Sequence, residues 1–446
     1  MSIKWAKKLR IIGFNKSVGY SFIGKAWLLI GGLATSFLIA TQFTPELQGY
    51  YYAFNSLLTL TVFAELGLSS IIVNFVSHEC LNLDISEYKK INGNENSISR
   101  LVSICHFSIR WFTAAALLIT IILIVIGSAF WSDGNYSSID WKLPWVALSI
   151  ATGSTLLITP ITSALEGCNQ LNNLYKFRII QYIVMSASCW LAILMGAELW
   201  TASISVMSGL LTLVLLSWTK YEQLIRTLFL NKPKLECINW RKDIFPMQWR
   251  IALSWIGGYF TFALFVPVLF RFHSPVLAGQ MGMTWAFVGA LMSISAAWIA
   301  PHSPNLGLMV ASKNYSELDK KFKNIFIVNT ALMVLGSISL VLANALLNYI
   351  NPSLGTRLLP IEITVIFLIG TVIYTMGLPI ATYLRAHKKE PLTMMSIIGG
   401  VVNGIMVIIL GSIFGAVGVA IAYTLCTLVT MPFLINIMNK KRREWH

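Results

Sequence analysis

Long apolar runs dominate this sequence and constrain its fold more than any other feature. A helix that crosses a membrane needs about 20 mostly apolar residues. Twelve runs of about this length are present. They cover residues 18–40, 50–76, 107–130, 143–165, 174–196, 200–219, 251–271, 279–301, 322–348, 358–384, 391–411 and 415–438. The runs predict an all-α, polytopic membrane protein with twelve transmembrane helices.

The amino-acid composition excludes the main classes of water-soluble protein. Of the 446 residues, 56% are hydrophobic and 11% are charged, and the mean hydropathy is +0.70. A soluble domain carries roughly 25% charged residues and about 45–50% apolar ones. Because one water-soluble core cannot hide this much apolar surface, a soluble enzyme, a disordered chain and a secreted disulfide scaffold are all excluded.

The basic residues gather in alternate loops. If the N-terminus is inside, nearly all Lys and Arg residues fall on the cytoplasmic side, and only Lys142, Arg271 and Arg357 fall on the opposite side. Cytoplasmic loops of membrane proteins carry such an excess of Lys and Arg. The asymmetry predicts that both termini are cytoplasmic. It also accounts for most of the net charge of +15 without a nucleic-acid partner.

Two halves of the sequence resemble each other. The motif Thr44-Pro45-x-Leu47-x-Gly49 precedes the second run, and Ser274-Pro275-x-Leu277-x-Gly279 precedes the eighth. In each half a Ser-Glu sequence follows 41 residues after the proline, at Ser86 and at Ser316. Six helices separate the copies, so we expect two parallel repeats of six helices around a central cavity, related by an axis along the membrane normal.

This repeat sets the expected domain organisation. Residues 1–220 form an N-terminal six-helix lobe, 221–250 a basic cytoplasmic linker, and 251–446 a C-terminal six-helix lobe. Two amphipathic segments at equivalent positions, about 79–100 and 302–321, are expected to be helices that lie on the headgroups. A duplicated bundle with short external loops is typical of an alternating-access carrier.

Sequence signatures of an enzyme are missing. The sequence contains no G-x-x-x-x-G-K-[ST] motif for nucleotide hydrolysis and no H-E-x-x-H motif for zinc. The six cysteines show neither a CxxC pair nor a metal-ligand spacing with histidine. We therefore expect a secondary transporter without a cofactor, a metal or a structural disulfide, driven by an ion gradient, the membrane potential or the substrate gradient.

Lys25 and Glu65 are the charged residues that fall clearly inside the apolar runs. A charged side chain at membrane depth costs at least about 2.5–3.5 kcal/mol and is by default a functional candidate. One interpretation is an ion pair that pins two helices together. The other is a water-filled cavity, in which Lys25 binds an anionic group of the substrate and Glu65 exchanges a proton or another coupling ion. The two interpretations are compatible.

Three further charged residues lie at the predicted outer ends of the helices. Arg271 ends the seventh run, while Arg357 and Glu362 flank the start of the tenth. Long basic side chains at helix ends reach the headgroups at low cost. Alternatively, Arg271 and Arg357 bind the substrate at the outer mouth, and Glu362 takes part in ion coupling.

Several short motifs are spread along the chain in a fixed order. They are Glu65-Leu66-Gly67-Leu68, Leu165-Glu166-Gly167-Cys168-Asn169, Tyr175-Lys176-Phe177-Arg178, Pro246-Met247-Gln248-Trp249-Arg250-Ile251-Ala252, Pro267-Val268-Leu269-Phe270 and Ala278-Gly279-Gln280-Met281-Gly282-Met283. Together these motifs resemble those of bacterial polysaccharide flippases, the Wzx-type branch of the multidrug/oligosaccharidyl-lipid/polysaccharide exporter superfamily. The resemblance covers essentially the whole chain. Its specificity rests on the combination and order of the motifs.

The resemblance implies a flippase of the bacterial inner membrane. Its substrate would be an undecaprenyl-diphosphate-linked oligosaccharide, such as an O-antigen or capsule unit of polysaccharide biosynthesis, moved from the cytoplasmic to the periplasmic leaflet. Ion-coupled antiport through a cationic cavity is also implied, with a polysaccharide polymerase and a chain-length regulator as partners. Lys25 fits this scheme because a diphosphate needs cations, although this chain has few deep charges.

Two other functions compete with the flippase. A cation-coupled multidrug antiporter of the same superfamily would favour acidic groups in its cavity, whereas the deep charges here include Lys25. A non-transporting membrane scaffold for glycan assembly fits the hydropathy equally well. It leaves Lys25 and Glu65 with no role other than pairing.

Overall fold

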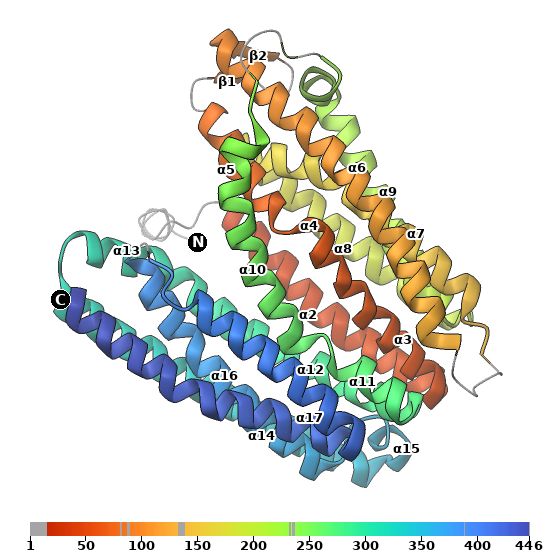
Figure 1. Cartoon of the computed structure of the whole chain (residues 1–446). Helices are drawn as coiled ribbons and strands as arrows, with labels where there is room; N and C mark the ends of the chain where they lie inside the picture. Colours follow the sequence, from red (N-terminus) through yellow and green to blue (C-terminus); the bar gives the residue numbers. More distant parts are fainter. Residues whose placement is uncertain are drawn as a thin grey trace, which may run out of the picture. The chain divides into compact units, whose positions relative to one another are not determined.

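The computed structural model describes residues 16–80, 83–86, 90–132, 139–231, 233, 237–387 and 389–445. These residues are almost entirely helical (Figure 1). The N-terminal basic residues Lys4, Lys7, Lys8 and Arg10, used above to predict orientation, lie outside the described residues. The same holds for Lys89, Lys232, Lys234 and Lys388.

The helices follow the apolar runs closely. In the first half they are α2 (Lys16–Gln42), α3 (Pro45–Leu58), α4 (Val62–Glu65), α5 (Leu68–Cys80), α6 (Glu95–Ser132), α7 (Lys142–Gly167), α8 (Leu171–Leu194) and α9 (Trp200–Phe229), with a short η1 (Thr59–Thr61). In the second half they are α10 (Phe245–Phe262), α11 (Phe265–Phe272), α12 (Pro275–Ile299), α13 (Ser303–Ala311), α14 (Tyr315–Ile350), α15 (Pro352–Gly355), α16 (Ile361–Ala386) and α17 (Thr393–Trp445), with η2 (Trp240–Ile244) and η3 (Ala300–His302).

Among the described residues, nine helices are long and apolar enough to cross a membrane. A tenth span is present if the broken pair Pro45–Glu65 and Leu68–Cys80 counts as one. Two features explain the difference from the predicted twelve. The seventh run divides into α10 and α11, and the last two runs are joined in α17. The chain is a multi-pass membrane protein, as predicted.

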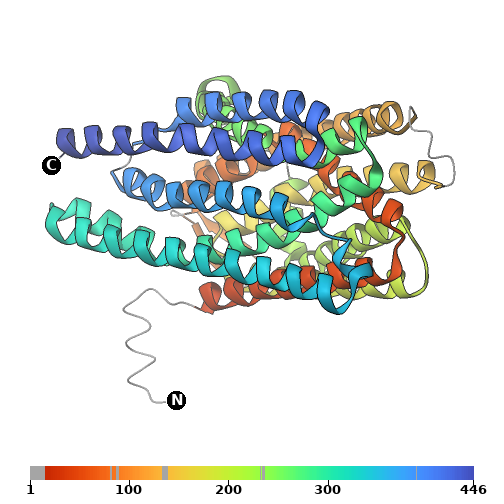
Figure 2. The same ribbon diagram turned by 90° about the horizontal axis from the view of Figure 1, so that it is seen from below.

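The long helix α17 contains both of the last two predicted spans. Its backbone breaks at Gly415, where φ is 64° and ψ is −140°, a conformation that glycine tolerates and other residues rarely adopt. Beyond the break the chain folds back, since the Cys426 thiol donates to the Gly399 carbonyl at 3.4 Å. Figure 2 shows the two halves of α17 in dark blue, running side by side.

The chain forms two compact units. Unit 1 contains residues 1–38 and 60–255, and unit 2 contains residues 39–59 and 256–446. The segment 39–59, which holds α3, therefore packs with the second half of the sequence. The assignment of residues 1–220, 221–250 and 251–446 to two repeated lobes and a linker stays a prediction.

In unit 1, close packing depends on small residues beside large aromatic ones. Trp145 of α7 is completely buried and donates from Nε1 to the Leu123 carbonyl of α6 at 3.0 Å. Its indole occupies the space beside Gly127, where a Cβ would lie 2.0 Å from Trp145 Nε1. Membrane helices lack a hydrophobic driving force for association, so such tight contacts and hydrogen bonds hold them together.

The core of unit 2 contains a cluster of aromatic rings from several helices. Phe265 of α11 makes edge contacts with Phe367 of α16 and Tyr423 of α17, with ring centroids 5.4 and 5.5 Å apart. Trp285 of α12 contacts Phe367 at 5.5 Å. Edge-to-face pairs at such distances are favourable beyond the area that they bury. This cluster joins α11, α12, α16 and α17.

The segment 79–100 differs from the prediction of a surface helix. Strands β1 (Leu83–Ser86) and β2 (Lys90–Gly93) pair antiparallel, with Leu83 opposite Gly93 and Ser86 opposite Lys90. The prediction was therefore wrong between the end of α5 and the start of α6. The segment 302–321 is helical as expected, in α13 and the start of α14.

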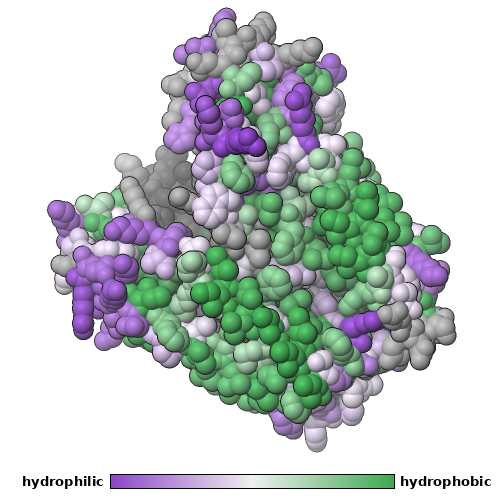
Figure 3. All heavy atoms as spheres, viewed as in Figure 1, coloured by the Kyte–Doolittle hydropathy of each residue, from purple (hydrophilic) through white to green (hydrophobic). Residues whose placement is uncertain are grey.

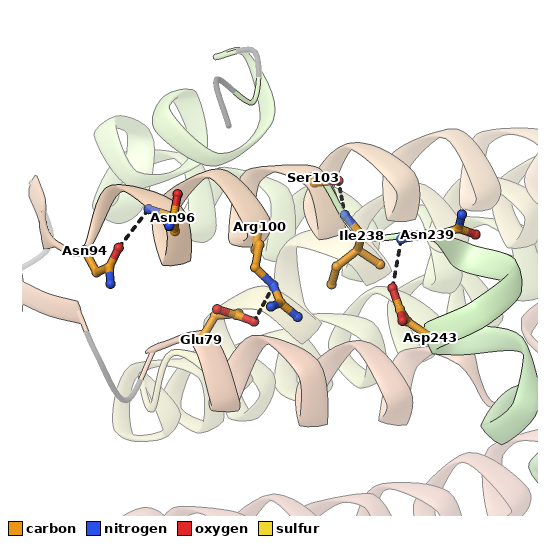
Figure 4. A network of polar contacts seen from close by, with 8 residues as sticks. All are labelled: Glu79, Asn94, Asn96, Arg100, Ser103, Ile238, Asn239 and Asp243. Carbon is orange, nitrogen blue, oxygen red and sulfur yellow. Dashed lines mark hydrogen bonds and ion pairs between the residues drawn. The ribbon is translucent and has the colours of Figure 1, made fainter. Parts of the chain in front are cut away.

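The predicted linker is partly integrated into unit 1. Trp240 stacks on Phe107 of α6 with ring centroids 6.3 Å apart, and its Nε1 donates to Gln248 Oε1 at 3.0 Å. The Ile238 N–H donates to Ser103 Oγ at 3.1 Å, and nearby Arg100 of α6 pairs with Glu79 of α5 at 3.1 Å (Figure 4). These contacts fix residues 237–248 against α6.

Apolar side chains cover the outside of the helices. On α6, Leu117, Leu118, Ile121 and Val125 are each at least 60% exposed. Figure 3 shows the green apolar surface along the middle of the helices and purple polar groups toward their ends. An apolar band of this kind is what lipid tails require.

Candidate functional site

Lys25 lies on α2, away from the face that packs on α8. The packing face is fixed by Trp27, whose Nε1 donates to the Tyr182 carbonyl and to Ser186 Oγ, both at 3.3 Å. Lys25 is exposed on another side of the helix. No ion pair of the described residues includes it, so its ammonium carries a charge that these residues do not neutralise.

Glu65 lies at a break in a membrane helix. It is the last residue of α4, and the next two residues, Leu66 and Gly67, have positive φ values of 47° and 68°. Glu65 is half-buried, and its Oε1 accepts a hydrogen bond from Ser69 of α5. Broken helices near the middle of the membrane are a common source of substrate and ion sites in transporters.

Within unit 1, Lys25 and Glu65 do not pair. The ion pairs of the described residues include neither of them, so the interpretation in which they pin two helices together is not realised. The structure does not test their predicted roles in substrate binding and ion coupling. Both residues are available for those roles, since Lys25 is exposed and the partner of Glu65 is a neutral hydroxyl.

Arg357 of unit 2 has protein partners. Its guanidinium donates to the Phe43 carbonyl at 2.6 Å and to Gln48 Oε1 at 3.4 Å. Gln48 in turn donates to the Arg357 carbonyl at 3.1 Å. Partial burial lowers the pKa of Arg357 below its ordinary value, although nearby Glu46 opposes this shift. The guanidinium stays a cation. Arg357 thus holds the start of α3 in place.

Arg271 and Glu362 lie at helix ends in unit 2. Arg271 is exposed in the last turn of α11, and Glu362 is exposed in the first turn of α16. A carboxylate in the first turn of a helix is stabilised by the helix dipole. Of the three outer residues, Arg357 is tied to a neighbouring segment by the contacts above. The substrate and coupling roles of all three stay predictions.

A polar cavity of about 290 Å³ lies in unit 1, where α2 and α8 begin. Its lining is made of lysine, tyrosine and amide side chains: Lys16, Tyr20, Asn169, Gln170, Asn172, Asn173 and Lys176. Lys176 lies over the ring of Tyr20, 5.1 Å from its centroid, which joins α8 to α2 at the cavity. Among the residues that the structure describes, none with an acidic side chain lines this cavity.

A chain of hydrogen bonds from α9 holds two residues of the cavity lining in place. Lys220 Nζ donates to Asn173 Oδ1 at 2.9 Å, and Asn173 Nδ2 donates to the Tyr221 hydroxyl at 2.9 Å. The Tyr221 hydroxyl donates to Gln170 Oε1 at 3.2 Å. Tyr221 is completely buried and Asn173 is 8% exposed, so this chain is a fixed part of the core.

Sequence reasoning missed this cavity. The signal was available in the amide-rich turn Asn169-Gln170-Leu171-Asn172-Asn173 between two apolar runs. The contribution of Lys16 and Tyr20 could not be found in this way, because they lie about 150 residues away.

Two cysteines in unit 1 also approach each other unexpectedly. Cys80 Sγ at the end of α5 lies 2.9 Å from Cys168 Sγ just after α7, and both are free thiols. They are 88 residues apart in sequence. Spacing rules for metal or redox motifs apply to nearby cysteines and could not reveal such a pair.

No protein-family model and no curated relative matches this sequence. Solved structures do match. A structure described as lipid II flippase MurJ in an inward closed conformation has a TM-score of 0.59 and 15% identity, covering 94% of this chain and 87% of that chain. An inward-facing multidrug resistance MATE family transporter of the MOP superfamily has a TM-score of 0.66 and 11% identity, covering 95% and 99%.

A mutant form of the Vibrio cholerae MATE transporter VcmN has a TM-score of 0.60 and 11% identity, covering 98% of both chains. At these identities the likeness establishes the fold, which is that of MurJ and the MATE transporters of the MOP superfamily. These neighbours are transporters and flippases, not enzymes. The polysaccharide branch expected from the sequence motifs is a finer assignment than this likeness carries.

Proposed function

Starting from the fold of the MOP superfamily, we propose that this protein is a lipid flippase. It moves an undecaprenyl-diphosphate-linked oligosaccharide from the cytoplasmic to the periplasmic leaflet of the bacterial inner membrane. It works by alternating access and is coupled to an ion gradient, and both termini are cytoplasmic. The MurJ neighbour, a lipid II flippase by its description, supports a lipid-linked substrate.

The observation that carries this proposal is the exposed, unneutralised Lys25 on α2. A cation within an apolar span costs about 2.5–3.5 kcal/mol unless a counter-charge compensates it. No carboxylate among the described residues pairs with Lys25, so an anionic group of the substrate is the natural counter-charge. A diphosphate supplies such a group, whereas a cationic drug would be repelled.

The other charged candidates receive distinct roles in this proposal. Arg271 and Arg357 are further substrate contacts at the outer end, and Arg357 also holds the start of α3. Glu65, at the break between α4 and α5, exchanges the coupling ion. Glu362, in the first turn of α16, takes part in ion coupling separately. A polysaccharide polymerase and a chain-length regulator would receive the product.

A cation-coupled multidrug antiporter is the second candidate. It is favoured by the carboxylate of Glu65 at the helix break and by the MATE neighbours. A carboxylate in a cavity attracts cationic compounds. This function, however, leaves the positive charge of Lys25 without a role. A non-transporting scaffold for glycan assembly is the third candidate, and it predicts no role for either charge.

The test uses a strain that lacks this protein in a background that tolerates stalled intermediates. We expect a complete undecaprenyl-linked oligosaccharide to accumulate on the cytoplasmic leaflet. The wild type and, in part, Lys25→Arg should reverse the accumulation, while Lys25→Ala should not. Lys323→Ala on α14 is the control, because Lys323 is also an exposed helix lysine.

Other outcomes select the competing functions. Normal glycan together with increased sensitivity to cationic dyes would identify a drug antiporter. Full reversal by Lys25→Ala at a normal protein level would remove the phosphate-binding role of Lys25. Glycan assembly that is lost in the deletion strain, and that both Lys25→Ala and Glu65→Gln restore, would favour a scaffold.

A further inference from the structure

The cavity where α2 and α8 begin offers hydrogen-bond donors and positive charge. Lys16 and Lys176 lie in its lining, and Lys220 lies behind it, bonded to Asn173. Each ammonium carries three donors and no acceptor. Since no carboxylate of the described part of the chain lines the cavity, the lysine charges are not neutralised within the lining.

Two amide side chains of the cavity are held by the protein. Gln170 Oε1 accepts from the Tyr221 hydroxyl, and Asn173 Oδ1 accepts from Lys220. Their N–H groups are bonded to protein groups as well, Asn173 Nδ2 to the Tyr221 hydroxyl at 2.9 Å and Gln170 Nε2 to the Cys168 carbonyl at 3.5 Å. These amides therefore form a fixed wall, and the ammonium groups of Lys16 and Lys176 are the donors that the cavity offers to a negatively charged ligand.

The start of α8 adds to this preference. The helix has 24 residues, and its N-cap residue Gln170 makes no side-chain capping hydrogen bond. The N-terminus of a helix carries a partial positive charge, which favours phosphate and other anions. Asn169, before the helix, adopts a positive φ of 58°, a conformation that asparagine tolerates better than most residues.

The size of the cavity limits what it can hold. Its volume of about 290 Å³ is close to the lower end of small-molecule sites, about 300 Å³. A phosphate or diphosphate group fits in this space, whereas a chain of several sugars does not. The cavity lies beside the first turn of α2, next to the beginning of the candidate membrane span at Gly19. The ends of a membrane span lie near the lipid headgroups.

We infer that this cavity binds the phosphoryl headgroup of a lipid in the adjacent leaflet. The lipid is either a prenyl diphosphate or an anionic phospholipid, and both present the same phosphoryl chemistry to Lys16 and Lys176. Lys25 is not part of this site. Lys16 and Lys25 are nine residues apart, about two and a half turns, so they lie on opposite sides of α2.

Binding of three ligands to the purified full-length protein tests this inference. They are phosphatidylglycerol, undecaprenyl diphosphate and soluble pyrophosphate, each titrated in neutral detergent and followed by native mass spectrometry. The site variant is Lys16→Gln with Lys176→Gln. The control variant is Lys142→Gln with Lys323→Gln, which removes the same charge from two other exposed positions.

We expect the site variant to bind the preferred lipid at least about tenfold more weakly than the control variant does. Lys176→Arg should keep most of the affinity, and the melting temperatures of the variants show whether they are folded. Preference for undecaprenyl diphosphate identifies a lipid-linked substrate as the occupant, and preference for phosphatidylglycerol identifies a membrane lipid. Equal affinity for pyrophosphate and both lipids means that the phosphoryl group alone is recognised.

Two results would overturn the inference. One is the absence of saturable binding for all three ligands, and the other is equal weakening in the site and control variants. The proposed flippase activity can fail separately. Lys25→Ala should abolish flipping and leave phosphoryl binding at this cavity unchanged, whereas a protein that flips nothing can still bind the headgroup.

Discussion

Gly49 and Gly279 lie against each other where α3 crosses α12 within unit 2. A Cβ on Gly279 would lie 2.9 Å from the Gly49 backbone nitrogen, and a Cβ on Gly49 would lie 2.0 Å from the Pro275 carbonyl oxygen. The two glycines occupy the same place in the two copies of the repeated motif. The copies therefore contact each other directly, and small residues allow their backbones this close approach.

The two copies also begin their helices in the same way. Thr44 Oγ1 accepts from the Leu47 N–H, and Ser274 Oγ accepts from the Leu277 N–H, both at 3.2 Å. A proline occupies the first turn in both helices. A hydroxyl N-cap followed by proline is a strong start signal for a helix. Gln48 then links the pair by donating to the Gly279 carbonyl at 2.9 Å.

We expect Gly49→Ala to destabilise the protein. The new methyl group has no space beside the Pro275 carbonyl, and forcing extra volume into a packed contact costs about 1–3 kcal/mol. Thermal unfolding in detergent measures the effect. Gly32→Ala on α2 is the matched control, because a Cβ there meets nothing within 4 Å. Equal melting temperatures for the two variants would contradict the close crossing of α3 and α12.

Glu65→Gln should weaken the dependence of transport on the proton gradient. The substitution keeps the shape of the side chain and its hydrogen bond with Ser69, but it removes the ionisable carboxyl group. Uptake or flipping is measured in proteoliposomes with and without an imposed pH gradient. Glu166→Gln, on the same unit near the end of α7, serves as the control. An unchanged pH dependence in Glu65→Gln would show that another group carries the coupling ion.

Cys80 and Cys168 should form a disulfide when the purified protein is treated with diamide. Two thiols 2.9 Å apart need little movement to form the bond, and they transfer two electrons and two protons to the diazene. Mass spectrometry after thiol blocking should find the loss of two blockable cysteines. Cys168→Ser is the control, and it should leave Cys80 blockable. A protein in which all six thiols stay blockable would refute this proximity.

Stability should fall on mild acidification because of His387. Burial lowers the pKa of His387 below its ordinary value of 6.5, with Lys389 acting in the same direction and the Tyr383 carbonyl and Asp319 opposing. The neutral form is therefore favoured in the folded state, and its stabilisation is complete above pH 6.5 and declines as the pH falls. The ring centroids of His387 and Trp445 are 4.6 Å apart.

Melting temperatures measured from about pH 7.5 to about pH 5.5 check this expectation. His387→Asn should lower the melting temperature at the higher pH and reduce its drop on acidification. Close to His387 in the sequence, Arg385 pairs with Glu390, and Arg442 pairs with Asp319, the carboxylate that opposes the shift. A drop of the same size in wild type and His387→Asn would assign the pH dependence to other groups.

The sequence was informative wherever a local signal sufficed. Apolar runs located the membrane helices, although α3 and α12 begin at Pro45 and Pro275, before the predicted starts at 50 and 279. Breaks in the helices at positive φ were predicted only in part. Gly415 separates two predicted spans as a backbone reversal, while Leu66 and Gly67 break a predicted continuous span, because a left-handed leucine has no clear sequence signature.

The features that the sequence did not predict depend on contacts between segments far apart in the chain. The pairing of Arg357 with Phe43 and Gln48 joins residues more than 300 positions apart. The polar cavity likewise combines Lys16 with the turn at Asn169–Asn173. Hydropathy and spacing describe one segment at a time, so neither can show which distant segments meet. The absence of an ion pair between Lys25 and Glu65, within the described residues, could not be foreseen for the same reason.

The placement of α3 in unit 2 has a consequence for biosynthesis. More than 200 residues separate Leu58, the end of α3, from Pro275, the start of α12. At a synthesis rate of about 5–20 residues per second, α3 leaves the ribosome roughly 10 to 45 s before its partner helix. During that interval Gln48 and Gly49 face lipid, the translocation machinery or a chaperone. Completion of unit 2 must therefore follow synthesis of the second half of the chain.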